Sequence, residues 1–251
     1  MGWFDEALGW LRSLALYELR SLAQRRLLHF YRGFLRPPGL AFDIGAHLGN
    51  HSRALLALGL RVVAVEPQPA LARRLAALAA KKPQLVVLPL ALADRPGRLT
   101  LALAPRAPTV ATASCAFQLL MQEQGVRYRG TLEVEAVTLD QLIAGFGRPD
   151  FIKLDAEGME PAILAGLSQA VPVLAFEHLP QRPEATLACL ERLMTLGDFR
   201  FDCVIGERRR FVFGRPLTAA ALQAALKHPP LATRAGDIYA FLTPSAADTM
   251  G

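Results

Sequence analysis

From Leu40 onward, short apolar runs alternate with stretches that have helical periodicity, and this feature constrains the fold most strongly. Short apolar runs bounded by turn residues are typical of buried strands, and the longer amphipathic stretches are typical of helices. The alternation therefore predicts repeated strand–helix–strand units around a parallel sheet. The expected strands are 40–44, 61–65, 85–90, 151–154, 173–176, 199–205, 210–213 and 238–242, and the expected helices are 50–58, 69–81, 160–169 and 183–196.

The chain before this alternation has a different pattern. Over residues 3–35, apolar side chains recur at steps of three and four, as on one face of an amphipathic helix, until Pro37 and the residues after it end the pattern. We therefore expect an N-terminal helical extension over residues 1–38 and an α/β domain over 39–251. The extension is expected to pack on the core or across a homodimer. Its tryptophans and arginines leave a weak contact with a membrane surface as an alternative.

Residues 97–137 interrupt the alternation. Residues 97–104 and 132–137 have the pattern of strands, whereas the stretch between them is mostly small and polar. Long loops at this position in an α/β sheet hang over the carboxyl edge, where ligands bind. We expect this insertion to act as a substrate lid.

Composition narrows the classes of partner and compartment. Basic residues give a net charge of +6, but they are not clustered with interleaved aromatic residues, so no nucleic-acid partner is expected. The three cysteines lack C-x-x-C spacing, which argues against a disulfide framework and a zinc site. Asp5 and Glu6 stand where a signal peptide would carry basic residues. We expect a cytoplasmic protein without a bound metal.

The segment AFDIGAHLGN, from Ala41 to Asn50, predicts a nucleoside site. It reads as a strand and a glycine turn that opens a helix, whose first N–H groups are free to bind a negative group. Gly45 and Gly49 form a G-x-x-x-G pattern, which lacks the third glycine of nicotinamide and flavin fingerprints and the lysine of a nucleotide-phosphate loop. A nicotinamide-dependent oxidoreductase is therefore disfavoured, and a ligand without phosphates is favoured.

A second acidic residue supports this interpretation. The predicted strand RVVAV ends at Glu66, which follows Asp43 by 66 − 43 = 23 positions. An acid about 20 residues further on binds the ribose hydroxyls in dinucleotide folds. The two motifs, in this order and spacing, favour S-adenosylmethionine as the cofactor.

The run DFIKLDAEGME, residues 150–160, carries charge into a predicted buried strand. Lys153 and Asp155 share one face of that strand, and buried charge is expensive unless it is paired or serves chemistry. Either the two residues form a pair that orders the site, or Asp155 acts on the substrate. A hydroxyl acceptor must lose a proton, and Asp155, Glu177 and His178 are the candidates to take it.

Two further groups of charged residues leave alternatives open. We expect Glu160 to cap the next helix, with a divalent cation held by Glu157 and its neighbours as the less favoured alternative. The run ERRR at 207–210 predicts a solvated hairpin turn, with a contact to an anionic substrate as the alternative.

The motifs FDIGAHLGN, VVAVEPQP, LALAD, VTLDQLI, DFIKLDAEGME and LAFEHLP, in this order, resemble the motif series of the FkbM family. The resemblance covers about residues 40–180 and implies a Rossmann-like class I methyltransferase fold with a mostly parallel seven-stranded sheet. It implies S-adenosylmethionine over the glycine turn, Glu66 on the ribose and Asp94 beside the adenine, although Asp94 also suits a simple turn. The expected cofactor residues are Asp43, Gly45, Ala46, His47, Gly49, Asn50, Glu66, Pro67, Ala93, Asp94 and Asp155.

The acceptor class also follows from the resemblance, which implies O-methylation of a hydroxyl on a small molecule, sugar or glycoconjugate. N-methylation is the alternative, because the fold does not fix the acceptor. A module that binds a nucleoside or docks on a membrane without catalysis is a third hypothesis. The expected catalytic residues are Asp155, His178, Lys153 and Glu177.

Overall fold

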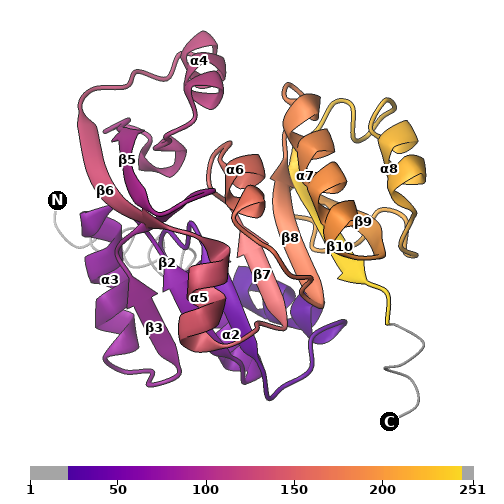
Figure 1. Ribbon diagram of the computed structural model, residues 1–251, viewed down its shortest axis with the longest axis horizontal. Helices are drawn as coiled ribbons and strands as arrows, with labels where there is room; N and C mark the ends of the chain where they lie inside the picture. Colours follow the sequence, from indigo (N-terminus) through magenta and orange to yellow (C-terminus); the bar gives the residue numbers. More distant parts are fainter. Residues whose placement is uncertain (1–21, 245–251) are drawn as a thin grey trace, which may run out of the picture.

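The computed structural model describes residues 22–244 (Figure 1). Its main sheet has seven strands in the order β3-β2-β1-β7-β8-β10-β9. The strands from β3 to β8 pair in parallel, whereas β10 runs antiparallel to both β8 and β9. The predicted mostly parallel, seven-stranded Rossmann-like sheet is confirmed. The strand order reverses between β1 and β7, which is where open α/β sheets bind ligands.

The bounds of the elements agree closely with the sequence pattern. The strands of the main sheet are β1 (Leu40–Ile44), β2 (Arg61–Val65), β3 (Leu85–Leu88), β7 (Phe151–Leu154), β8 (Val173–His178), β9 (Phe199–Ile205) and β10 (Gly236–Leu242). The helices around it are residues 22–32, α2 (Asn50–Leu58), α3 (Pro69–Ala79), α5 (Leu139–Phe146), α6 (Glu160–Ala165), α7 (Pro183–Leu196) and α8 (Ala219–Ala225).

The expected strand at 210–213 is wrong. This stretch is a loop, in which Val212 makes one backbone hydrogen bond to Cys203 while the ring of Phe211 packs on Phe30 and Tyr239. Its apolar residues therefore belong to a side-chain cluster and not to a strand.

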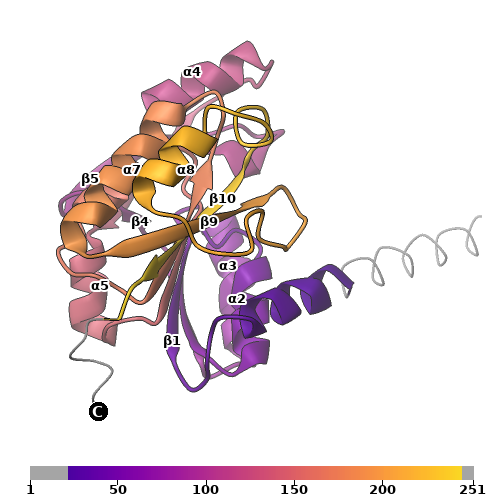
Figure 2. The same ribbon diagram turned by 90° about the vertical axis from the view of Figure 1, so that its right-hand side faces the viewer.

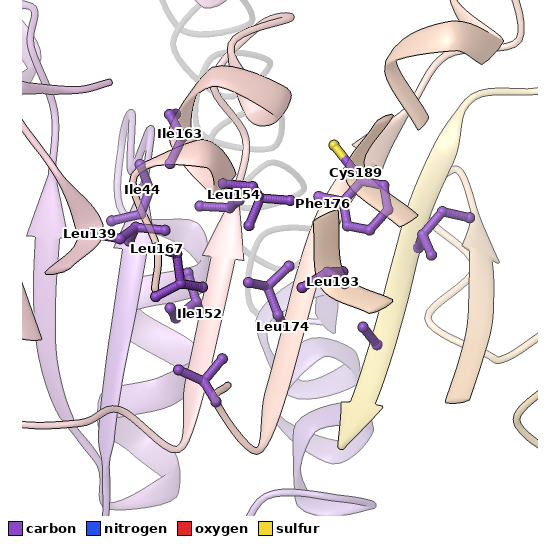
Figure 3. Packing of buried hydrophobic residues seen from close by; sticks show 14 of the residues in the cluster. Ile44, Leu139, Ile152, Leu154, Ile163, Leu167, Leu174, Phe176, Cys189 and Leu193 are labelled. Atoms are coloured by element: carbon purple, nitrogen blue, oxygen red, sulfur yellow. The ribbon is translucent and has the colours of Figure 1, made fainter. Parts of the chain in front are cut away.

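Different helices cover the two faces of the sheet (Figures 1 and 2). Helices α5, α6, α7 and α8 pack on one face, and α2, α3 and the helix 22–32 pack on the other. Side chains alternate along each strand, so Ile44, Leu154 and Phe176 point to the first face, where Ile44 lies near Leu139 of α5 and Phe176 near Cys189 of α7 (Figure 3).

The helix 22–32 belongs to the core of the domain. Leu27, Phe30 and Tyr31 are buried against the second face of the sheet, and Leu35 follows them. The expectation that the extension packs on the core is confirmed for this part, while the predicted helix before residue 22, with its suggested membrane contact, lies outside the described residues. Within residues 22–244, no helix combines the length and apolarity needed to cross a membrane.

The insertion at 97–137 forms a small subdomain beyond the carboxyl ends of the parallel strands, at the top of Figure 1. Two of its strands join β4, which precedes it in the chain, in a second sheet of order β4-β6-β5, and it also holds two short helices. These elements are β4 (Ala91–Leu92), β5 (Gly97–Ala102), η1 (Pro108–Val110), α4 (Cys115–Glu123) and β6 (Thr131–Val137). The hydroxyl of buried Thr112 donates to the backbone oxygen of Glu157 at 2.7 Å, which fastens the insertion to the loop after β7.

Candidate functional site

A cleft of about 1270 Å³ lies at the carboxyl ends of β1, β2 and β7. Its walls come from the glycine turn after β1, the end of β2, the loop after β7, the insertion and the helix 22–32. Some of the predicted cofactor residues line it directly. These are Gly45, Ala46, His47, Asn50, Glu66, Pro67 and Asp155.

The two glycines of the turn serve contacts within the protein. Both have left-handed backbones, with φ of 76° at Gly45 and 77° at Gly49. A Cβ on Gly45 would lie 1.8 Å from the backbone oxygen of Asp155, and a Cβ on Gly49 would lie 2.7 Å from Cδ2 of Leu75. The turn after β1 and the loop after β7 are therefore in backbone contact at Gly45, and the turn packs on α3 at Gly49.

Asp43 lies behind this turn and does not line the cleft. Its Oδ2 accepts hydrogen bonds from the backbone N–H of Ser52 at 2.8 Å and from the Ser52 hydroxyl at 2.5 Å. Burial raises the pKa of Asp43 to about 6, against the opposite effect of the Ser52 hydrogen bonds. Asp43 thus anchors the first turn of α2. It can affect the cofactor only indirectly, by positioning the glycine turn.

Glu66 lies at the end of β2 with its carboxylate at the cleft. One oxygen accepts from the backbone N–H of His47 at 2.8 Å, and the other accepts from that of Gln68 at 2.9 Å. Burial raises the pKa of Glu66, while these two hydrogen bonds lower it. Each carboxylate oxygen has a second lone pair, so the group can also accept hydrogen bonds from ligand hydroxyls.

Ala93 and Asp94 stand apart from the cleft. The wall is made instead by the preceding residues, Ala91 and Leu92. The N–H of buried Ala93 donates to the backbone oxygen of Val137, and the Asp94 side chain is half exposed beside Arg95. This placement fits the turn interpretation of Asp94 better than a contact with adenine.

The cleft fits the predicted nucleoside cofactor. Glu66 offers acceptors for ribose hydroxyls, and Leu92 and Leu101 give an apolar wall for a base. The Nε2 atom of His47 is buried and has no hydrogen-bond partner among the described residues. A ligand that brings a polar atom to this ring would satisfy it.

Lys153 forms the centre of a buried charge cluster. Its Nζ lies 3.0 Å from Oδ1 of Asp237, 3.0 Å from the backbone oxygen of Leu154 and 3.5 Å from Oδ2 of Asp155. Burial alone would lower the pKa of Lys153, but the two carboxylates outweigh it and raise the pKa. The predicted Lys153–Asp155 pair is present, and Asp155 also lines the cleft. Asp155 can therefore pair with Lys153 and still act on a substrate.

Asp237 was not predicted from the sequence. It lies on β10 directly opposite Glu177 of β8, and this antiparallel neighbour brings it beside Lys153. The only sequence signal is an acid in an otherwise apolar run, which alone does not name a partner 84 positions away.

Two more carboxyl groups, Glu157 and Glu177, face the cleft near Asp155. Burial and the neighbouring Glu177 raise the pKa of Glu157 to about 9, and burial together with Asp155 raises the pKa of Glu177. Glu160 is buried and accepts from the backbone N–H of Ala156 at 2.8 Å, in line with its expected capping role. Over residues 22–244, no three His, Cys, Asp or Glu side chains come close enough to hold a metal ion.

His178 points away from the cleft. Side chains alternate along β8, so Glu177 faces the polar side of the sheet while His178 faces α7. Its Nδ1 lies 2.8 Å from the Thr186 hydroxyl and its Nε2 lies 3.0 Å from the backbone oxygen of Leu231. With both nitrogens engaged and the ring buried, the structure does not support the prediction that His178 takes a proton from the acceptor.

The helix 22–32 contributes residues that sequence reasoning missed. The hydroxyl of buried Tyr31 is hydrogen-bonded to Nδ1 of His51, and burial lowers the pKa of His51 to about 3, so this imidazole is neutral. Gln24 donates to the backbone oxygen of Asn50 at 3.1 Å. The helix is thereby tied to the first turn of α2, beside the glycine turn.

Several solved methyltransferase structures are similar to this chain at low identity. Precorrin-6y C5,15-methyltransferase from Geobacter metallireducens is 14% identical, with a TM-score of 0.43 over 90% of this chain and 87% of its own. A putative O-methyltransferase from Klebsiella pneumoniae is 9% identical, with a TM-score of 0.45 over 89% and 80%. A TehB-like SAM-dependent methyltransferase from Corynebacterium glutamicum is 12% identical, with a TM-score of 0.42 over 92% and 97%. No curated protein matches the chain.

The family comparison is more specific. Residues 43–201 match the methyltransferase FkbM domain, and this range holds the glycine turn, Glu66, the insertion and the charged loop after β7. The site therefore takes S-adenosylmethionine as its cofactor. The chain belongs to the FkbM methyltransferase domain family and is an S-adenosylmethionine-dependent methyltransferase.

Proposed function

We propose that the enzyme methylates a hydroxyl group on a small molecule, a sugar or a glycoconjugate. The observation that carries this proposal is the arrangement of Asp155, Glu157 and Glu177 around one part of the cleft. A hydroxyl must lose its proton when its oxygen takes the methyl group, and a carboxylate such as that of Asp155 is a suitable acceptor for that proton.

Bound S-adenosylmethionine supplies a methyl group on a sulfur that is already an activated leaving group. The protein has to hold the acceptor oxygen behind that carbon and receive the proton. Asp155 is suited to both tasks, because it lies at the carboxyl end of β7 and its loop is in backbone contact with the glycine turn. The buried ammonium of Lys153, with Asp237 on its other side, holds the Asp155 carboxylate in place.

Glu157 and Glu177 complete the acceptor side. A protonated carboxyl group donates one hydrogen bond and still accepts others, so a carboxyl group with a raised pKa can bind neighbouring hydroxyls of a polyhydroxylated acceptor. The Oε2 atom of Glu177 is buried and has no partner among residues 22–244, which leaves it available for such a hydroxyl. The insertion, which supplies Thr109 and Thr112 to the wall, serves in this proposal as the lid over the acceptor.

The proposal is tested by methyl transfer from S-adenosylmethionine labelled in its methyl group. Purified enzyme is incubated with sugars and phenols on one side and with their amino analogues on the other, and the labelled product is identified by mass spectrometry. We expect label on oxygen. Transfer to the amines alone would replace the proposal with N-methylation.

A further inference from the structure

Part of the cleft wall comes from segments other than the glycine turn, the end of β2 and the loop after β7. It includes Gln24 and Leu27 of the helix 22–32 and Glu207 and Arg209 of the loop after β9. None of these four residues lies within the matched family domain, which covers residues 43–201. The parts of the chain that flank the family domain therefore supply this part of the cleft wall.

Arg209 differs from the other residues of its charged run. The side chain of Arg209 is only 15% exposed, whereas that of Glu207 is 88% exposed and Arg208 and Arg210 also face solvent. Its backbone has φ of 49°, which is uncommon for a residue with a side chain and occurs at functional sites. The run is therefore not uniformly the solvated turn that its sequence suggests.

The loop that carries Arg209 is anchored by packing. Two residues further on, the ring of Phe211 packs at 4.9 Å from that of Phe30 and at 5.3 Å from that of Tyr239. These contacts join the loop to the helix 22–32 and to β10. A guanidinium held by a rigid loop loses little conformational entropy when it binds a ligand.

The guanidinium has an exchangeable partner. Its ion pair is with Glu207, whose side chain is almost fully exposed, so water competes for the carboxylate of this pair. The other charged groups are less available, because Lys153 lies between two carboxylates and His51 is neutral. Arg53 of α2 and Arg74 of α3 also line the cleft, but unlike Arg209 they lie within the matched family domain.

We propose that Arg209 binds an anionic group of the methyl acceptor, a carboxylate or a phosphate, and that the Glu207 carboxylate occupies this position until the acceptor displaces it. This inference rests on the proposed function, because it names the class of hydroxyl compound that the enzyme takes. Guanidinium binds both anions through paired hydrogen bonds. Gln24 and Leu27 also line the cleft, with one polar and one apolar side chain.

The test compares glucuronic acid, glucose 6-phosphate and neutral glucose by isothermal titration of the full-length enzyme saturated with S-adenosylhomocysteine. We expect at least one anionic probe to bind about tenfold more tightly than glucose, as a charge-assisted hydrogen bond allows. The better of the two anions identifies the group that the subsite takes. Equal affinity for all three compounds, or no binding of either anion, would overturn the proposal.

Three variants assign the effect to the guanidinium. Arg209→Gln should lose the preference for the anion, and Glu207→Gln should strengthen binding of the anion severalfold, because the competing carboxylate is gone. Arg208→Gln, at the exposed neighbour, is the matched control and should behave as the parent enzyme. Melting temperatures verify that each variant is folded.

The same titrations exclude a role at the cofactor. Arg209→Gln should leave the affinity for S-adenosylhomocysteine unchanged, and a large loss would reassign Arg209 to the cofactor carboxylate and overturn the proposal. The labelling experiment is read separately. Methylation of amines with a preference for anionic amines would refute O-methylation while supporting the anion subsite. Methylation of hydroxyls without a preference for anions would support O-methylation and refute the anion subsite.

Discussion

The two faces of the central sheet bury different kinds of side chain. The face under α5, α6, α7 and α8 is lined almost entirely by apolar residues, such as Leu154 and Phe176. The face under α2 and the helix 22–32 includes Asp43, Lys153 and Tyr31 among its buried residues. Neighbouring residues on one strand therefore have different tasks, and position along the strand decides which residues can take part in chemistry.

The largest expected effect compares two consecutive residues on opposite faces. Asp155→Asn should lower kcat by about 10²- to 10⁴-fold, the range for loss of a general base, while the affinity for S-adenosylhomocysteine changes little. Leu154→Ala, on the apolar face, should instead cost about 2–5 kcal/mol of stability and leave kcat of the folded enzyme nearly unchanged. Steady-state kinetics and denaturant unfolding separate the two. Full turnover in Asp155→Asn would remove Asp155 from the mechanism.

The next effect concerns the buried cation. Lys153→Met should destabilise the fold by about 3–5 kcal/mol, because Asp155 and Asp237 would face each other without a positive charge between them. Ile152→Val, the preceding residue on the apolar face, should cost only about 0.5–1.5 kcal/mol. Similar losses in urea unfolding would mean that the two faces are equally tolerant, contrary to the charge cluster described above.

A smaller effect tests the placement of His178. His178→Ala should cost about 1–3 kcal/mol, since Thr186 and the backbone oxygen of Leu231 lose their buried partner. The kcat of the folded variant should stay within about twofold of the parent value. A fall in kcat by orders of magnitude in a variant that still binds S-adenosylhomocysteine would reinstate His178 as the base.

The smallest effect is a dependence of stability on pH. The pKa of Glu157 is about 9 in the folded chain, above its ordinary value of 4.5, so between these values the folded chain keeps a proton that the unfolded chain releases. Stability from this group is therefore fully present below pH 4.5 and falls as the pH rises toward 9. Glu157→Gln should raise the melting temperature at pH 8, because the glutamine has no proton to lose, and have no such effect at pH 4. An equal shift at both values would mean that the group is not buried as its acid.

Much of the fold could be predicted because the apolar alternation depends on local sequence. The glycine turn, the end of β2 and the charged loop after β7 are each continuous segments, and their order along the chain identified the cofactor side of the site. The same periodicity already separates Glu177 from His178, since consecutive strand residues face opposite sides. The prediction of His178 as a base considered its pKa and not this alternation.

The features of the fold and the site that could not be predicted depend on contacts between segments far apart in the sequence. Asp237 reaches Lys153 only because β10 inserts antiparallel between β8 and β9, and no local pattern fixes that order. The strand expected at 210–213 fails for the same reason, because its apolar residues pack against the helix 22–32. Tyr31 and Arg209 likewise acquire their roles from long-range packing.

The close approach of Gly45 to Asp155 has a consequence for how such an enzyme diverges. At this point the two loops meet through main-chain atoms, so the contact itself makes no demand on the identity of the surrounding side chains. Substitutions elsewhere in the cleft wall can therefore change what is accepted while this contact is kept. Residue 45 is the exception, because even a methyl group there would push the loops apart.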